Sequence, residues 1–221
     1  MRHQRLTGLL GFVRQQRGLM LFILLLGVFR GAIADWSPVP TGSMNPTIVP
    51  GDVIWVNKLA YDVRVPFSEI TLARLAEPQR GDIVVFRSAA ADKRLVKRVI
   101  CLPGDEVMLR GNRLIVNSQT ADYQPLHSQL DGDFTESLPD MTHAVRFTPT
   151  HLARSANFGP VRIPQDQFLV LGDNRNNSAD SRVYGFVPRR EIVGRASHVL
   201  LSVHLALPPE PRFERFVTPL L

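Results

Sequence analysis

The chain has 221 residues, the length of one ordinary domain or of one domain with a small appendage. Apolar residues make up 44% and charged residues 21%, a balance that excludes global disorder. The formal net charge is +6, but five arginines and no acidic residue precede Asp35, so the body is nearly neutral, which argues against nucleic-acid binding. The single cysteine, Cys101, excludes an intrachain disulfide and a multi-cysteine zinc site.

An apolar segment lies close to the N-terminus. Residues 19–29 read LMLFILLLGVF and follow a basic stretch. As a helix, residues 18–34 would be about 26 Å long, the lower limit for crossing a bilayer core of roughly 30 Å. We therefore predict a basic cytoplasmic N-terminus over residues 1–17, a single transmembrane anchor over 18–34 in the inner or plasma membrane, and an extracytoplasmic domain over 35–221, because arginines before a span favour the cytoplasmic side.

A cleavable secretory signal is the alternative for this segment. The apolar run precedes Ala32-Ile33-Ala34, an A-x-A pattern typical of cleavage sites. Arg30 lies between the run and this pattern, which favours an uncleaved anchor. We therefore predict that the site is not cut, and under either interpretation the domain that follows is exported.

Short β-prone runs dominate the rest of the chain. Three Gly-Asp turn pairs precede the runs VIWV, IVVF and EVML. We expect a mainly β fold with an irregular sheet system, and a polar insertion over about residues 117–160 that forms a loop or β-ribbon. The further expected strands are 94–102, 113–116, 167–171 and 194–203, and a short helix is expected around 67–76.

Most standard catalytic motifs are absent from the sequence. It has no H-E-x-x-H, no cysteine pair, no Gly-rich phosphate loop and no G-x-S-x-G elbow. The histidines show no ligand-like spacing, so neither a metal nor another cofactor is expected. A histidine-dependent serine triad stays open, because such triads are recognised by geometry rather than by spacing.

Ser43 is the first candidate catalytic residue. It lies in PTGSMNPT, after a glycine and between two prolines. Gly42 can adopt many backbone conformations, whereas the prolines on either side of Ser43 have fixed φ angles. The backbone can therefore expose the Ser43 hydroxyl beside backbone N–H groups. A plain turn serine is the simpler interpretation of the same residues.

Lys97 is the second candidate, because it is one of three lysines beside 23 arginines and lies in an expected strand. With a period of two it shares a face with Leu95, Val99 and Cys101. Burial can lower a lysine pKa from about 10.4 to near 7 or 8, whereas arginine keeps its proton. A neutral lysine could deprotonate a serine for acyl transfer. A lysine at a sheet edge with its ammonium in water is an equal alternative.

Four segments carry a resemblance to a known family. They are PTGSMNPT around Ser43, GDVIWVNKLAYDVR from Gly51, RGDIVVFR with KRVICLPGD between Arg80 and Asp105, and GDNRNNSADSRVYGFVP from Gly172. In this order the sequence resembles the type I signal (leader) peptidases, which are membrane-anchored serine–lysine endopeptidases. With the apolar N-terminal segment, the matching parts cover well over half of the chain.

The resemblance implies a role for each matching residue. Ser43 would be the nucleophile and Lys97 the general base. Ser178 would hydrogen-bond the lysine amine and orient it. Asp180 and Arg182 would form a supporting ion pair near the site.

The resemblance also implies an oxyanion hole and substrate pockets. The oxyanion donors would be the Ser43 backbone N–H and the hydroxyl of Thr41, which replaces the commoner serine. Asn176 stands where the family often has aspartate, which removes one charge near the site. Small pockets for the substrate residues one and three before the cut would be lined by Val39, Pro40, Met44, Ile48, Leu95 and Val96.

The implied function is removal of N-terminal signal peptides from exported preproteins after Ala-x-Ala-like sites. The partners would be preprotein signal peptides and membrane lipid, without nucleic acid. A specialised pilin-type processing peptidase with the same dyad is one alternative, and an inactive exported binding module of the same fold is another. Self-cleaving repressors of the SOS type share a similar β-fold, but they would carry a DNA-binding domain instead of a membrane segment.

Overall fold

The computed structural model describes residues 16–68, 70–126, 132–148 and 156–220. Its centre is a sheet of nine described strands in the order β1-β2-β16-β5-β6-β14-β15, with β17 and β18 paired to β16. Neighbouring strands along this path are antiparallel. The strands are β1 (Ala34–Pro38), β2 (Asp52–Asn57), β5 (Ile83–Ser88), β6 (Lys93–Cys101), β14 (Gln167–Leu171), β15 (Val187–Pro188), β16 (Ile192–His204), β17 (Glu210–Pro211) and β18 (Thr218–Pro219).

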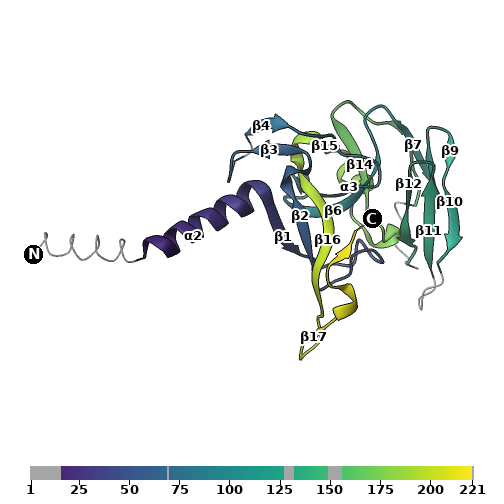
Figure 1. Ribbon diagram of the computed structural model, residues 1–221. Helices are drawn as coiled ribbons and strands as arrows, with labels where there is room; N and C mark the ends of the chain where they lie inside the picture. The colour runs from purple at the N-terminus through teal and green to yellow at the C-terminus, as the bar shows by residue number, and fades with distance from the viewer. Residues whose placement is uncertain (1–15, 69, 127–131, 149–155, 221) are drawn as a thin grey trace, which may run out of the picture.

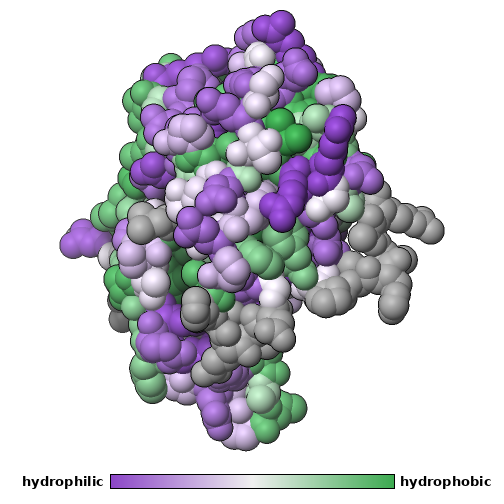
Figure 2. All heavy atoms as spheres, turned by 90° about the vertical axis from the view of Figure 1, so that its right-hand side faces the viewer, coloured by the Kyte–Doolittle hydropathy of each residue, from purple (hydrophilic) through white to green (hydrophobic). Residues whose placement is uncertain are grey.

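Two of the smaller sheets lie on the side of the molecule away from the N-terminal helix (Figure 1). Residues 117–160, expected as a polar insertion, contribute strands to two of them, and purple hydrophilic residues spread over much of this face (Figure 2). The four-stranded sheet consists of β13 (Phe158–Arg162), β7 (Glu106–Arg110), β8 (Arg113–Val116) and β9 (Gln119–Thr120). The three-stranded sheet consists of β10 (Asp122–Pro125), β11 (Asp133–Leu138) and β12 (Met141–Arg146). In a separate two-stranded sheet, β3 (Asp62–Arg64) pairs with β4 (Thr71–Arg74).

The core lies on both faces of the central sheet. Strands β5 and β14 read IVVFRS and QFLVL, continuous apolar runs that fit strands covered on both sides. One face contains a cluster with Val39, Met44 and Val85, and the other contains a cluster with Phe86 and Val170. The strands that later carry the site are therefore held rigidly from both sides.

Most of the expected strands are found within two residues of their predicted bounds. The expected helix at 67–76 is wrong, because Thr71–Arg74 forms strand β4 instead. All four side chains of β4 are exposed, so this segment has no buried face of the kind that stabilises a short helix. A four-residue helix, α3 (Ser181–Tyr184), occurs where none was expected.

The N-terminal apolar segment forms helix α2 (Arg17–Val28), which continues as one π-helical stretch over Phe29–Ile33. The helical residues end at Ile33, because Ala34 enters β1 and pairs with Asn57. Helix α2 extends away from the β body (Figure 1) and measures about 18 Å. Within the described ranges, no helix combines the length and the apolar character needed to cross a membrane. Nearly all of the predicted basic N-terminus lies outside these ranges.

Two glycines with a left-handed φ lie in the turns that precede β2 and β7. Gly51 (φ +93°) and Gly104 (φ +90°) each precede an aspartate, but a Cβ at Gly51 would lie 2.0 Å from the Val203 carbonyl oxygen, whereas Gly104 has no neighbour within 4 Å. We expect Gly104→Ala to cost about 1 kcal/mol of unfolding free energy from backbone strain, and Gly51→Ala to cost at least roughly 2 kcal/mol more. Urea unfolding of both variants measures the difference, and equal losses would contradict the close approach.

Candidate active site

Ser43 lies in the loop that joins β1 to β2. The loop is closed at its neck by hydrogen bonds from Val39 N–H to the Asp52 carbonyl (2.8 Å) and from Gly51 N–H to the Val39 carbonyl (3.0 Å). Within the loop, Met44 and Ile48 are buried in the apolar cluster that also contains Val39 and Val85. These two side chains fix the loop, so the half-buried Ser43 between them and β6 has a defined position.

Lys97 reaches Ser43 from strand β6. Its Nζ lies 2.8 Å from Ser43 Oγ and 2.9 Å from the Val96 carbonyl oxygen. The residue is 3% exposed, and burial lowers its pKa from 10.5 to about 8, although the nearby carboxylates of Asp180 and Asp173 oppose this shift. A hydroxyl thus faces an amine that can be neutral near physiological pH, which is the arrangement that activates a serine for nucleophilic attack.

Gly172 lies in close contact with both Ser178 and the loop that carries Ser43. A Cβ there would lie 2.3 Å from Ser178 Oγ and 2.4 Å from the Ser43 carbonyl oxygen. The Ser178 hydroxyl is buried beside these atoms, and no hydrogen bond between it and Lys97 is found in the described part of the chain. Only glycine lets the Ser178 segment approach the nucleophile loop this closely.

Asp180 and Arg182 form a buried ion pair, with 2.8 Å between Arg182 Nη2 and Asp180 Oδ2. Asp180 also accepts hydrogen bonds from the Gly172 and Arg182 backbone N–H groups, the latter as the N-cap of α3. These contacts lower the pKa of the Asp180 carboxyl against the opposite effect of burial. Arg182 further donates to the Arg175 carbonyl at 2.7 Å, so the pair ties the chain on both sides of Ser178 together.

A second clamp holds the nucleophile loop, and the sequence interpretation missed it. Asn174 donates its backbone N–H to the Ser43 carbonyl and its Nδ2 to the Gly42 carbonyl, both at 3.1 Å. The neighbouring Asp173 accepts from Thr47 Oγ1 at 2.5 Å and pairs with Arg98 at 2.9 Å, with both charged side chains almost fully buried. The GDNR motif carried the signal for this clamp, since an unusual run of polar residues directly after a buried strand rarely lacks partners.

The insertion supplies charges to the same buried network, which was not expected. Glu136 of β11 pairs with Arg175, with both side chains fully buried and 2.5 Å between Arg175 Nη2 and Glu136 Oε1. The same carboxylate accepts a short hydrogen bond from Tyr123. His143 of β12 is buried against Glu136 and Asp173, and burial lowers its pKa to about 4, so it is neutral at pH 7. No local sequence pattern distinguishes Glu136 or His143 as members of this network.

The structure divides the residues that were expected to line the substrate pockets. Val39, Met44, Ile48 and Val96 gather in one cluster next to Ser43. Leu95 packs into the cluster on the opposite face of β6, since neighbours along a strand point to opposite sides. Pro40 is exposed at the surface.

The surroundings of the expected oxyanion donors are open. Thr41 is exposed, and within the described residues the Ser43 backbone N–H makes no hydrogen bond, so it is available to a ligand. Asn176, at the position where an aspartate is common, accepts from Asn112 Nδ2 at 2.7 Å and donates to the Thr148 carbonyl at 3.0 Å. An amide can make both bonds, whereas a carboxylate could only accept. In the described ranges, no group of three or more His, Cys, Asp or Glu side chains is placed to hold a metal ion.

Comparisons with known proteins agree with this geometry. A family model described as signal peptidase, peptidase S26, matches residues 13–201. A probable signal peptidase I-2 from Synechocystis sp. is 36% identical over 180 residues, which cover 79% of this chain and 66% of that protein. A signal peptidase I from Pseudomonas fluorescens is 33% identical over 210 residues, which cover 87% of this chain and 71% of that protein.

The chain therefore spans about two thirds of the length of the Synechocystis relative. Among solved structures, a signal peptidase I from Enterococcus faecalis is 26% identical with a TM-score of 0.37, over 56% of this chain and 99% of that one. Because the family model matches most of its length, the chain belongs to the signal peptidase family, peptidase S26.

Proposed function

We propose that the protein is a type I signal peptidase that removes signal peptides from exported preproteins by cutting after Ala-x-Ala-like sites. The observation that carries this proposal is the 2.8 Å contact between Ser43 Oγ and the buried Lys97 Nζ. Family membership gives the same reaction class. The pair needs neither a histidine nor a metal, because a neutral amine can accept the hydroxyl proton directly.

The reaction follows the two halves of acyl transfer. Lys97 Nζ takes the proton of Ser43 Oγ as the oxygen attacks the scissile carbonyl carbon, and the resulting oxyanion is stabilised by the Ser43 backbone N–H. When the C–N bond breaks, the lysine ammonium gives its proton to the leaving amine, and the signal peptide stays bound to Ser43 as an ester. Lys97 then deprotonates a water that attacks this ester, and collapse of the second intermediate returns the proton to Ser43.

The remaining matched residues support this pair. We assign Thr41 as the second oxyanion donor, since its exposed hydroxyl lies two residues before Ser43. Ser178 is assigned as the residue that orients the lysine amine once substrate is bound, because its buried hydroxyl lies beside the Ser43 loop and Asp180. The ion pair of Asp180 and Arg182 is assigned a structural role.

Small side chains before the cut fit the cluster of Val39, Met44, Ile48 and Val96. Filling such an apolar pocket discriminates by roughly 1–3 kcal/mol per methylene, so size selection alone is modest. Tethering enzyme and substrate to one membrane would raise their effective concentration and compensate for this limit.

We propose that the apolar segment predicted over residues 18–34 is the membrane anchor, with the β domain on the extracytoplasmic side. Its support is the exposure of the apolar side chains of α2, for example Phe22 at 61% and Leu24 at 62%, none of which is buried. The Ala32-Ile33-Ala34 site should stay uncut, because Ala34 is 3% exposed and is already a paired member of β1.

Two alternatives keep the fold but change the function. A pilin-type processing peptidase would use the same pair on a dedicated substrate, so only substrate profiling separates it from a general signal peptidase. A binding module without activity is disfavoured by the short Ser43–Lys97 contact and by the lowered pKa of Lys97, because binding alone requires neither.

Replacing either member of the pair should abolish cleavage. We expect Ser43→Ala and Lys97→Met each to lower kcat/KM on a preprotein in detergent at least roughly a thousandfold, because each removes a group that the chemical step requires. Lys93→Met, an exposed lysine on the same strand, is the matched control and should keep full activity. Near-normal rates in both site variants would disprove the assignment.

Activity should depend on pH through the neutral form of Lys97. Because the base must be unprotonated and its pKa is about 8, kcat/KM should rise about tenfold per pH unit below pH 8 and level off above it. The Lys93→Met control should keep the same shape of profile, with its rise moved slightly to higher pH, because the charge of Lys93 contributes to the lowered pKa of Lys97. A profile that is flat from pH 6 to 8, or whose rise is centred near 10.5, would contradict a desolvated lysine base.

Adding one methyl group at Gly172 should disable the site. The new Cβ would push Ser178 and the Ser43 carbonyl apart, and a displacement of about 1 Å in a catalytic group can cost roughly a hundredfold in rate. We expect Gly172→Ala to reduce kcat by about this factor with little change in KM. Gly18→Ala, whose Cβ meets no atom within 4 Å, is the control. Unchanged turnover of Gly172→Ala would refute the close approach.

A further inference from the structure

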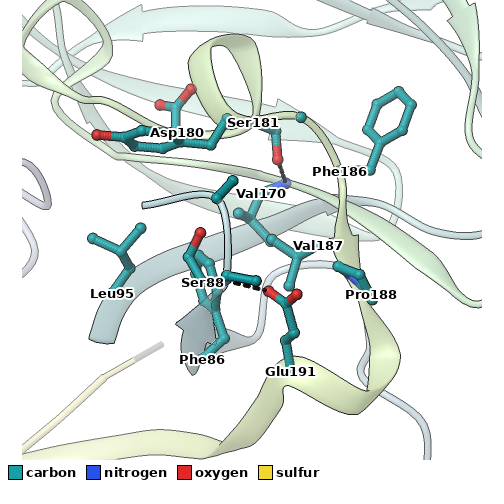
Figure 3. A pocket seen from close by; sticks show the side chains of 14 residues that line it. Phe86, Ser88, Leu95, Val170, Asp180, Ser181, Phe186, Val187, Pro188 and Glu191 are labelled. Atoms are coloured by element: carbon teal, nitrogen blue, oxygen red, sulfur yellow. Dashed lines mark hydrogen bonds between the residues drawn. The ribbon is translucent and has the colours of Figure 1, made fainter. Parts of the chain in front are cut away.

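A cavity of about 180 Å³ opens beside the candidate site but contains neither Ser43 nor Lys97 (Figure 3). It lies over the β5–β6 side of the sheet, between the end of the β5–β6 hairpin and helix α3. Its volume corresponds to roughly six waters at about 30 Å³ each, which is enough for one large side chain. Among its lining residues are Phe86, Ser88, Leu95, Val170, Tyr184 and Glu191.

The cavity lies along a stretch of β6 whose second edge is unpaired. On one side, β5 pairs with β6 from Lys93 to Arg98. On the other side, β14 begins to pair only at Arg98, and no other described strand covers the residues before it. Alternate backbone groups along 93–97 therefore face no second strand, although the Val96 carbonyl already accepts one hydrogen bond from Lys97 Nζ. Adding a strand to such an edge is a common way for proteins to bind extended peptides.

The hydrogen bonds of Val99 show which backbone groups face this open edge. Val99 accepts from the Gly81 N–H and donates to the Asp82 carbonyl, each at 2.8 Å, so it bonds towards the β5 side. Alternate residues of an antiparallel strand bond to alternate sides. The N–H and C=O groups of Arg94 and Val96 therefore point to the open edge.

Strand β1 and its extension form the opposite wall. Val39 bonds to the β2 side through Asp52 and Gly51, which leaves the other edge of this segment free of any described strand. The two walls are held at a fixed separation by the ion pair of Arg94 and Asp35 at 3.0 Å. An extended substrate can lie between them with its scissile carbonyl at Ser43.

The two-residue period of a strand then places the substrate side chains. Residues that pair across from Arg94 and Val96 point to the face of Val96, which packs in the cluster with Val39 and Met44. These are the substrate residues one and three before the cut, whose side chains are small. The residue between them must point to the other face, where Leu95 lines the cavity.

We propose that this cavity is the subsite for the middle residue of the Ala-x-Ala motif, and that it selects a large, mainly apolar side chain there. The proposal rests on the proposed signal peptidase function. Phe86, Leu95 and Val170 supply apolar walls (Figure 3). The carboxylate of Glu191 lies on its lining, so an acidic side chain is repelled, whereas the Asp180 carboxylate on the same lining is paired with Arg182.

The test uses Ala-x-Ala preprotein substrates that differ only at the middle residue. For the full-length protein in detergent we expect kcat/KM to be about tenfold higher with leucine than with alanine there, and lowest with glutamate. Ala90→Leu, which fills the cavity from its rim, should bring the leucine-to-alanine ratio close to one. Ala91→Leu is the matched control, because Ala91 is the next residue of the same hairpin and does not line the cavity; its ratio should equal that of the parent protein.

A charge reversal provides a second test that does not depend on packing. Glu191 accepts only one long hydrogen bond from the described residues, at 3.4 Å from the Ala89 N–H, so Glu191→Lys should be tolerated and should raise the relative rate for glutamate at the middle position several-fold. Ratios that are identical in the parent, Ala90→Leu and Glu191→Lys proteins would overturn the subsite while leaving the proposed function intact. A parent protein that cuts none of the substrates, with Ser43 and Lys97 present, would overturn both.

Discussion

The whole site depends on one buried amine that must be uncharged when Ser43 attacks. Lys97 is 3% exposed, so its protonated form lacks the solvation it would have in water. Two carboxylates nearby, Asp180 and Asp173, would restore the charged form if they were unpaired. Each is instead neutralised by its own arginine, at 2.8 Å by Arg182 and at 2.9 Å by Arg98. The ion pairs therefore act on the chemistry indirectly, because the two carboxylates raise the pKa of Lys97 and the positive charge of Arg182 offsets part of that rise.

The same requirement explains why the segment after β14 is so polar. Between Gly172 and Arg182 the chain must hold the nucleophile loop, approach Ser43 closely and supply paired charges beside Lys97. A segment with these tasks cannot be anchored by apolar packing alone, and Arg175 anchors it instead through the buried carboxylate of Glu136. The insertion thus stabilises the polar segment after β14 through the ion pair of Glu136 with Arg175, although it lies far from the nucleophile in sequence.

The sequence predicted those parts of the structure that depend on local pattern. Strand β8 matched its predicted bounds because RLIV is short, β-prone and flanked by turn residues. The proximity of Ser43 and Lys97 could be expected only from the family resemblance, since 54 residues separate them. Glu136 could not be found, because the partner that justifies its burial is 39 residues away and no periodicity marks it. The residues expected to line the two substrate pockets include both Leu95 and Val96, although a period of two places these neighbours on opposite faces of the strand.

The position of β6 shows how one strand can supply both the base and the selection of substrate. Lys97 and Leu95 share one face, and Val96 lies on the other, so three consecutive residues set the positions of the amine and of the two pockets that we propose. A slip of one residue would turn Lys97 away from Ser43 and exchange the pockets at the same time. The bulge at Gly81, with φ +92°, pairs Gly81 and Asp82 against Val99 and thereby fixes this register. The accuracy of the catalytic contact is therefore set two residues beyond the base, where Val99 bonds to the turn that precedes β5.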